Sequence, residues 1–222
     1  MKRTIATALL LLLVSLAGFA QGRYLPLGIN GTSVLISTGS RNGTIKDFYA
    51  EAGYAIGGRL EVSLQGGAMF EELDGENETI PNFSIGFDAA VMKQQRAVPF
   101  SLIAGVRVGF ASAMPENRSI FGTNYGFSML ACHDFWIVDR WLIGVGGVFN
   151  YDRYRFDITD SSTVPSTESE ERMHIITYGP ALDVGFRYFE DNLLVLRTDL
   201  LWNQDAELIL RLNLLLVVPS TK

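Results

Sequence analysis

The sequence is poor in the residues on which several classes of protein depend. It has one cysteine, Cys132, so no internal disulfide can form, and two histidines, too few to favour a transition-metal site. Basic residues form no cluster beyond Lys2 and Arg3, and the formal net charge is −6, which argues against a nucleic-acid partner. After residue 20 there is no run of about 18 apolar residues without a charge, so no transmembrane helix is expected there. We therefore expect no cofactor, no metal and no nucleic acid.

The N-terminal segment has the pattern of a secretory signal peptide. Lys2 and Arg3 form a basic start, residues 5–19 form an apolar stretch rich in leucine, and residues 18–20 provide a small-any-small cleavage site before Gln21. The apolar stretch is shorter than the roughly 20 residues of a membrane-spanning helix, which favours cleavage over an uncleaved anchor. The sequence therefore predicts a cleaved signal peptide over 1–20 and a single domain over 21–222.

Apolar and polar residues alternate through the rest of the chain. In the segment 208–216 every second residue is leucine, and Arg211 and Asn213 lie between the leucines. A period of two is typical of a β-strand with one oily and one polar face. About ten such segments recur, with eight as the alternative, and each is close to the roughly 9–11 residues with which a tilted strand crosses a bilayer. They lie near 28–38, 48–56, 60–70, 83–91, 100–110, 125–134, 141–151, 176–188, 194–202 and 208–216.

The links between these segments alternate in length. Polar links of moderate to large length are expected at 40–44, 71–81, 112–124 and 159–172, and tight turns at 57–59, 93–97, 138–140 and 190–192. Outer-membrane barrels have this arrangement, because their periplasmic turns are short and their outward loops are longer. The last link, 203–206, is short where the rule expects an outward loop. The pattern predicts an all-β, antiparallel, up-and-down transmembrane β-barrel.

Aromatic and glycine residues indicate the same architecture. Aromatic residues gather at the two ends of the predicted strands, as in barrels with an aromatic girdle at each membrane interface. Most glycines fall on the polar parity, which leaves room inside the barrel for long charged side chains. The outward girdle, at the strand ends that point away from the periplasm, comprises Phe48, Phe70, Phe110, Tyr125, Phe127, Phe149, Tyr151 and Trp202. The inward girdle, at the periplasmic strand ends, comprises Phe100, Phe135, Trp136, Trp141, Tyr188 and Phe189.

Over about residues 22–218 the chain resembles the small bacterial outer-membrane β-barrel family, the OmpA/OmpX-like transmembrane barrels. The resemblance rests on the alternation, the links and the girdles rather than on a motif. It implies a monomer in the bacterial outer membrane, in contact with outer-membrane lipid. One departure is that residues 219–222 follow the last strand, where members of the family usually end in an aromatic residue. The alternative is a soluble periplasmic, lipocalin-like barrel whose oily face points inward.

If the oily parity faces lipid, the other parity fills the lumen. Counting back from the predicted hairpin turns gives a ladder of opposite charges across three neighbouring strands, an internal lock. Acidic residues outnumber basic ones inside, so a narrow cation-preferring pore is one alternative, although side chains can largely fill so narrow a barrel. The ladder comprises Asp183, Arg197, Asp199 and Arg211, and the other inward residues are Glu51, Glu61, Asp88, Arg107, Asp134, Asn150 and Arg187.

Catalytic chemistry has little support in the sequence. His133 has Asp134 beside it, but neighbours on a strand point to opposite faces. His174, with Ser166 and Ser169 nearby, lies at the outward end and leaves an outer-leaflet lipid hydrolase as an alternative. A solvated polar loop explains these residues without chemistry, so we expect no enzyme.

The outward loops are the remaining place for function. An acidic run over residues 71–78 and a Ser/Thr/Glu-rich segment over 161–172 are candidates for contact with divalent cations or with a surface protein. The sequence therefore predicts a structural or surface-interaction role through these loops.

Overall fold

The chain folds into one closed β-barrel. The computed structural model describes residues 21–41, 44–73, 76–95, 98–114, 118–160, 167–189 and 191–220. In these ranges ten antiparallel strands follow one another around the barrel in sequence order. The strands are β1 (Gly31–Arg41), β2 (Thr44–Ile56), β3 (Leu60–Leu73), β4 (Glu76–Met92), β5 (Ser101–Ala113), β6 (Arg118–Ile137), β7 (Trp141–Asp160), β8 (Thr167–Tyr188), β9 (Asn192–Asn203) and β10 (Leu208–Pro219).

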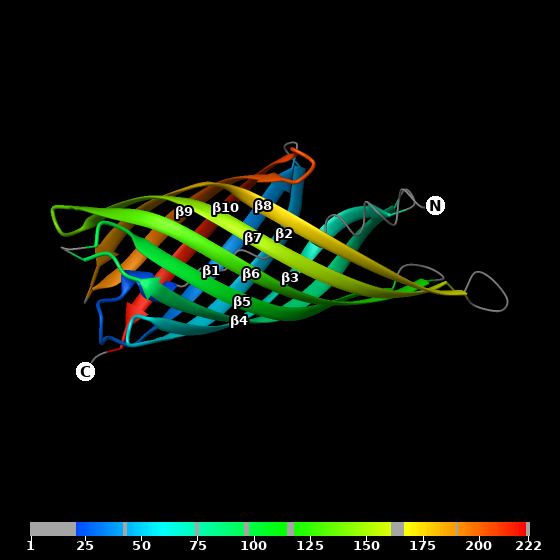
Figure 1. Cartoon of the computed structure of the whole chain (residues 1–222), viewed down its shortest axis with the longest axis horizontal. Helices are drawn as coiled ribbons and strands as arrows, with labels where there is room; N and C mark the ends of the chain where they lie inside the picture. Colours follow the sequence, from blue (N-terminus) through cyan, green and yellow to red (C-terminus); the bar gives the residue numbers. More distant parts are fainter. Residues whose placement is uncertain are drawn as a thin grey trace.

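The barrel closes between its first and last strands. β10 pairs with β1 from Gly31 opposite Pro219 to Arg41 opposite Ile209. The strands slope across the long axis of the molecule in Figure 1, as they must when a sheet closes into a barrel. The predicted up-and-down barrel is confirmed, and the strand number within the described residues is ten rather than eight.

Alternation sorts the side chains between the two faces of the wall as the sequence predicts. On β10, Leu210 is 38% exposed and Leu212 is 42% exposed, whereas Arg211 between them is 2% exposed. Because a slip of one residue would turn every side chain to the opposite face, this pattern fixes the register of each strand. The apolar parity points outward, which is the reverse of what a soluble barrel with an oily interior requires. The lipocalin-like alternative is therefore wrong.

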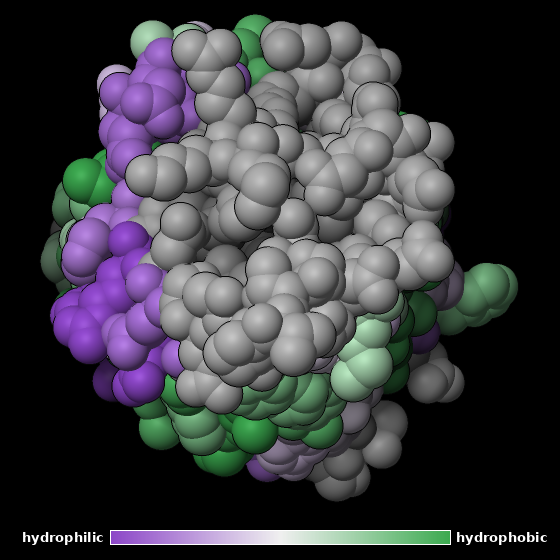
Figure 2. Space-filling view, turned by 90° about the vertical axis from the view of Figure 1, so that its right-hand side faces the viewer, coloured by the Kyte–Doolittle hydropathy of each residue, from purple (hydrophilic) through white to green (hydrophobic). Residues whose placement is uncertain are grey.

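The two ends of the barrel differ in construction. One end, the turn end, carries the tight links 57–59, 138–140 and 189–191. At the other end, the long-strand end, β8 has 22 residues whereas β10 has 12. At about 3.3 Å per residue, the additional length is about 33 Å along the strand. The extensions of β6, β7 and β8 (residues 118–126, 151–160 and 167–176) form a three-stranded ribbon that reaches farthest to the right in Figure 1. On its β6 side the ribbon stays paired with β5 as far as Ile120 opposite Ala113. Figure 2 looks onto this end and shows hydrophilic residues gathered along one flank.

Three links that the sequence predicts as long loops consist mostly of strand. Between β3 and β4 only residues 74–75 separate the strands, between β5 and β6 only 114–117, and between β7 and β8 only 161–166. An antiparallel ladder already in register gains backbone hydrogen bonds whatever the polarity of its side chains. Polar composition therefore marks the end of the apolar band rather than the end of the strand. The predicted tight turn at 93–97 is instead a longer link over 93–100, with a bridge between Gln95 and Val98.

The segment before β1 lies at the turn end. It begins with the 3-10 helix η1 (Gln21–Tyr24) and reaches β1 through residues 25–30. The amide of Gly28 donates to the carbonyl of Gly57 at 3.0 Å, and the amide of Ser220 donates to the carbonyl of Asn30 at 2.8 Å. The predicted signal peptide, 1–20, lies outside the described residues. Within those residues, no helix has the length and apolar character to cross a membrane.

Candidate functional site

The inward face of the barrel gathers the charged residues that the sequence analysis names. Two of them lie towards the turn end: Asp134, with 12% of its side chain exposed, and Arg187, with 34% exposed. The Arg187 guanidinium lies 4.3 Å from the centre of the Trp136 ring. The others are buried in the lumen: Glu51, Glu61, Asp88, Arg107, Asn150, Asp183, Arg197, Asp199 and Arg211.

The predicted charge ladder occupies neighbouring positions on β8, β9 and β10. Asp183 lies opposite Arg197, and Asp199 lies opposite Arg211. Arg197 donates from Nε to Oδ1 of Asp183 at 2.7 Å and from Nη2 to Oδ2 at 3.2 Å, a bidentate pair. Asp199 accepts from Nδ2 of Asn213 at 3.0 Å and lies 3.9 Å from Nε of Arg197. These residues form one polar layer of the lumen, and their role as an internal lock stays a prediction.

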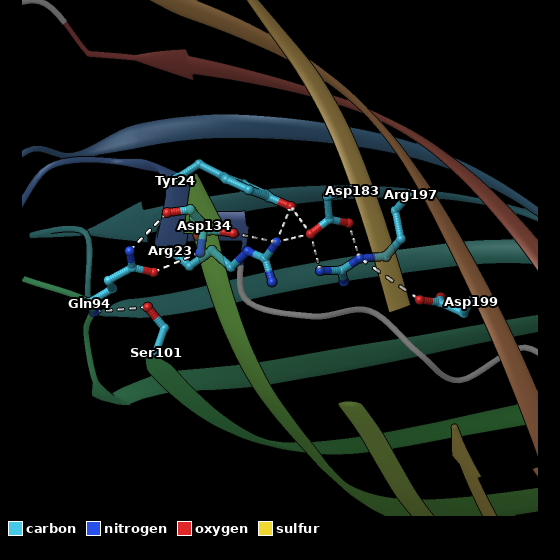
Figure 3. Close-up of polar contacts among 8 residues, drawn as sticks. All are labelled: Arg23, Tyr24, Gln94, Ser101, Asp134, Asp183, Arg197 and Asp199. Carbon is cyan, nitrogen blue, oxygen red and sulfur yellow. Dashed lines mark hydrogen bonds and ion pairs between the residues drawn. The ribbon is translucent and has the colours of Figure 1, made fainter. Parts of the chain in front are cut away.

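An arginine from the N-terminal segment completes this layer. Arg23, on η1, has a fully buried side chain, and its Nη2 donates to Oδ2 of Asp183 and, at 2.6 Å, to the hydroxyl of Tyr24. Tyr24 donates to Oδ2 of Asp183 at 3.0 Å, and Oδ1 of Asp134 lies 3.4 Å from Nη2 of Arg23. Figure 3 shows Arg23 and Arg197 approaching the Asp183 carboxylate from its two sides. One carboxylate thus holds two guanidiniums, and the N-terminal segment occupies the lumen at the turn end.

The sequence analysis missed Arg23 and Tyr24. It assigned lumen residues from the alternation of strands, and these two residues precede β1 in a segment that does not alternate. A weak signal is present in the sequence, because Arg23 follows the predicted cleavage site and is succeeded by the apolar residues Leu25, Leu27 and Ile29. An isolated cation in front of an apolar stretch suggests insertion into a polar interior.

A lysine from the link between β4 and β5 holds the N-terminal segment from the side. The Nζ of Lys93 donates to the carbonyl of Gly58 at 2.7 Å and also to the carbonyl of Leu25. Burial, together with the nearby Arg59 guanidinium, lowers the pKa of Lys93 to about 8. One side chain therefore ties the segment before β1 to the turn between β2 and β3.

Gln94, the next residue of the same link, fastens it to β6. Its Nε2 donates to the carbonyl of Asp134 at 2.8 Å, and its Oε1 accepts from the amide of Asp134 at 2.7 Å. The amide of Gln94 donates to the Ser101 hydroxyl at 2.9 Å (Figure 3). A side-chain amide that pairs with both backbone groups of one residue acts like an added strand residue, so Gln94 fixes the start of this link against β6.

Apolar side chains fill the lumen on both sides of the polar layer. Along β9, Leu193 and Val195 precede Arg197 and Asp199, and Leu201 follows them. On β10, which runs in the opposite direction, Ile209 precedes Arg211 and Asn213, and Leu215 and Val217 follow them, so the layers match those of β9. An apolar layer on each side keeps water from the charges and strengthens their mutual attraction. The layer at the turn end comprises Leu25, Leu35, Tyr49, Ala55, Leu142, Leu193, Val195, Leu215 and Val217, and the other comprises Ile103, Leu130, Cys132, Val148, Ala181, Leu201 and Ile209.

Glycines on the inward face make room for carboxylates on the neighbouring strands. Asp88 lies opposite Gly105, and Asp152 lies opposite Gly126. A Cβ atom on either glycine would overlap the facing carboxylate. Beside these residues and Arg107 there is a cavity of about 10 Å³, enough for about one water molecule. Around Asp88, Arg107 and Asp152 the described side chains therefore leave little space, although they are polar.

At the long-strand end His174 contacts Tyr151. Its Nδ1 lies 2.8 Å from the hydroxyl of Tyr151. Of the residues named for a hydrolase, Ser166 and the side chain of Ser169 lie outside the described residues. The same holds for residues 74–75 and for the side chains of the rest of the acidic run over 71–78. The described contacts of His174 are those of a surface residue with a polar neighbour.

Solved structures with a similar fold are known, at low sequence identity. No family model and no curated protein sequence matches this chain. The translocator domain of the autotransporter NalP from Neisseria meningitidis has a similar structure, with a TM-score of 0.54 and 9% identity, over 87% of this chain and 88% of that one. The chain has the fold of a bacterial outer-membrane β-barrel. The attachment invasion locus protein Ail of Yersinia pestis is less similar, with a TM-score of 0.41 and 10% identity, over 87% of this chain and 99% of that one. At such identities the likeness concerns the fold alone.

Proposed function

We propose that the protein is a closed outer-membrane β-barrel that acts through its long-strand end. The apolar outward parity, the two aromatic girdles and the fold support a position in the outer membrane. In that position the turn end faces the periplasm and the ribbon stands on the outside of the cell. A cleaved signal peptide over 1–20, a monomeric state and contact with outer-membrane lipid belong to the same proposal.

The observation that carries the proposal is the filled lumen. Arg23, Asp183 and Arg197 cross its polar layer, and apolar side chains fill it above and below. An ion that entered would have to displace hydrogen-bonded arginines or apolar side chains, each at a cost of several kcal/mol by our order-of-magnitude estimate. This supports a structural or surface-interaction role over a cation-preferring pore.

The ribbon is the surface on which such an interaction would take place. Its strands continue well beyond the outward girdle, and they pair with one another as far as Asp160 opposite Thr167. A paired sheet holds its side chains in fixed positions, which lowers the entropy that a partner's binding would otherwise cost. Beyond Tyr151 and Ile176 the described outward side chains of β7 and β8 are polar or charged, among them Arg153, Arg155 and Arg172. On β6 the exposed Phe121 lies opposite Asp157.

Conductance in planar bilayers tests the closed state. The full chain without residues 1–20 is refolded, its folding is checked by gel mobility that shifts on boiling, and it is inserted beside an open porin as a positive control. We expect no current steps from the protein. Cation-selective steps that change in Asp183→Asn would overturn the proposal.

Trypsin added to intact cells tests the orientation. Arg155 and Arg172 are 57% and 60% exposed, so cleavage in the ribbon is expected without lysis, while Arg140 in a turn of the opposite end should be cut only after lysis. The reverse order of cleavage would contradict the assigned orientation.

A further inference from the structure

The outward face of β7 changes in character where the ribbon leaves the barrel. Up to Tyr151 its outward residues are apolar, aromatic or glycine, and the next two are Arg153 and Arg155. On β8 the change falls at the same level, where Ile176 is followed towards the tip by His174 and Arg172. The outward residues of β7 below this level are Trp141, Ile143, Val145, Gly147, Phe149 and Tyr151.

These basic residues face one another across the strand pair. Arg153 lies opposite His174, and Arg155 lies opposite Arg172. Like charges directly opposite each other in a sheet repel. Glu170 relieves part of this repulsion, since its carboxylate accepts from Arg172 Nε at 2.6 Å and lies 3.3 Å from Arg155 Nη2. A second carboxylate, that of Asp157, lies 3.7 Å from Arg155 Nε. Three arginines therefore share two carboxylates, which leaves an excess of positive charge and unused donors on this surface.

Aromatic rings lie within the same surface. The Arg153 guanidinium lies 5.7 Å from the centre of the Tyr125 ring on β6, and Tyr151 bonds His174. Tyr125 is 50% exposed and points outward. Guanidinium groups beside aromatic rings combine donors for an anion with a flat apolar surface, a combination that suits a phosphorylated sugar.

We propose that Arg153, Arg155, Arg172 and His174, the rim cluster, bind the phosphate groups of the glycolipid that forms the outer leaflet. The proposal rests on the orientation given under the proposed function. In that orientation the cluster lies on the lipid side of the wall. It begins one residue pair beyond Tyr151 and Ile176, with Arg153 opposite Tyr125 of the outward girdle, and this is the level of the headgroups. The planar forks of the arginines match phosphate oxygens. A phosphate bound to the donors that Glu170 and Asp157 do not use would reduce the remaining repulsion between Arg155 and Arg172.

The test uses the refolded chain in neutral detergent, titrated with lipid A, and it compares two variants that lose the same charge. The first carries Arg153→Gln, Arg155→Gln and Arg172→Gln. The control carries Arg59→Gln, Arg140→Gln and Arg187→Gln at the turn end. We expect the control to bind lipid A like the unmodified protein and the rim variant to bind at least about tenfold more weakly. Equal affinities of the two variants would overturn the proposal.

Two further lipids identify the chemistry of the ligand. Lipid A without its phosphates should bind the unmodified protein as weakly as intact lipid A binds the rim variant. Equal binding with and without phosphates would overturn the role of phosphate. Phosphatidylglycerol should bind more weakly than lipid A, and equal binding would refute the choice of a glycolipid.

The same preparations separate this inference from the proposed function. Gel mobility that shifts on boiling and absence of conductance show whether each variant is a closed barrel. If the protein is a closed barrel and lipid A binds the unmodified protein and the rim variant equally, only the inference is refuted. A conducting barrel, or trypsin cleavage in the reverse order, would refute the proposed function itself.

Discussion

The barrel interior and the ribbon consist of the same alternating strands, yet they hold their charged residues in opposite surroundings. Arg197, inside, has 8% of its side chain exposed and makes a bidentate pair with Asp183. Arg155, on the ribbon, has 57% exposed and lies 3.3 Å from Glu170. A buried charge that loses its partner has no water to replace it, whereas an exposed pair contributes little net free energy. The interior ion pairs should therefore contribute more to stability than the exposed pairs of the ribbon.

The two regions also differ in how their backbone edges are covered. In the barrel every strand has two partners, but the pairing of β8 with β9 begins at Thr177 opposite Asn203. Beyond that point β8 pairs only with β7, so the ribbon has an edge that can open without opening the barrel. Substitutions in the interior should therefore cost more stability than substitutions in the ribbon.

Asp183→Asn should cause the largest loss of stability. The variant keeps the shape of the side chain but leaves Arg23 and Arg197 buried without their shared carboxylate. We expect the free energy of unfolding to fall by about 3–5 kcal/mol, measured by urea titration of the refolded protein with tryptophan fluorescence. Asp191→Asn is the matched control, because its carboxylate is 75% exposed and lies 3.7 Å from Arg187. Its effect should be below about 1 kcal/mol, and equal effects would show that the lumen network contributes no special stability.

Gly105→Val should cause the second-largest loss of stability. The added side chain must displace the Asp88 carboxylate, so we expect a loss of about 1–3 kcal/mol in the same titration. Gly147→Val is the control, since that glycine faces outward and an added Cβ meets no atom within 4 Å. In the double variant with Asp88→Ala, the cost of valine should fall, because the group that it displaces is absent. If the losses of stability from Gly105→Val and Asp88→Ala simply add in the double variant, the glycine is required for a reason other than the Asp88 carboxylate.

The sequence was sufficient for the barrel wall because one physical rule, alternation, decides it. A strand between lipid and a polar lumen must separate its side chains by parity, and Leu208, Leu210, Leu212 and Leu214 around Arg211 all point outward. The same rule assigned Asp183 and Arg197 to the lumen and the glycines to the inward face. Each inference required only neighbours along the chain and the register of a short hairpin turn.

Two other features depend on contacts that no local pattern reveals. Arg23 enters the lumen because Asp183, far away in the sequence, offers it a carboxylate. The ribbon is strand rather than loop because ladder pairing continues through polar residues such as those around Asp157 and Glu170, which lie opposite each other. Composition suggested a loop in that segment. Pairing in space determined the outcome in both cases.

Stability should also depend on pH through Lys93, by a smaller amount. Its pKa is lowered from 10.5 in the unfolded chain to about 8 in the fold, so the unfolded chain binds the proton more tightly. Stability should therefore rise as the pH increases from about 8 to 10.5, while below about 8 the cost of the buried charge is present in full. Since Lys93 is partly exposed, we expect a rise of about 1 kcal/mol.

The measurement is the free energy of unfolding of the unmodified protein minus that of Lys93→Met across this range. The subtraction removes the titration of other groups, tyrosines in particular. A difference that stays constant or falls with pH would contradict the assigned pKa. A rise would confirm that the fold lowers the pKa of Lys93.

The smallest effect is expected at the edge of the ribbon. Gln204, in the turn between β9 and β10, accepts from the amide of Ile176 at 3.2 Å and donates to the carbonyl of His174 at 3.2 Å. Gln204→Ala removes both bonds, so hydrogen exchange of the Ile176 amide should accelerate about tenfold with unchanged global stability. Asp205→Ala, in the same turn, should leave that exchange rate unchanged. If Ile176 accelerates only together with amides of the wall, the ribbon opens with the barrel and the two regions form one cooperative unit. If it accelerates alone, the ribbon can rearrange around a partner while the lumen network keeps the barrel closed.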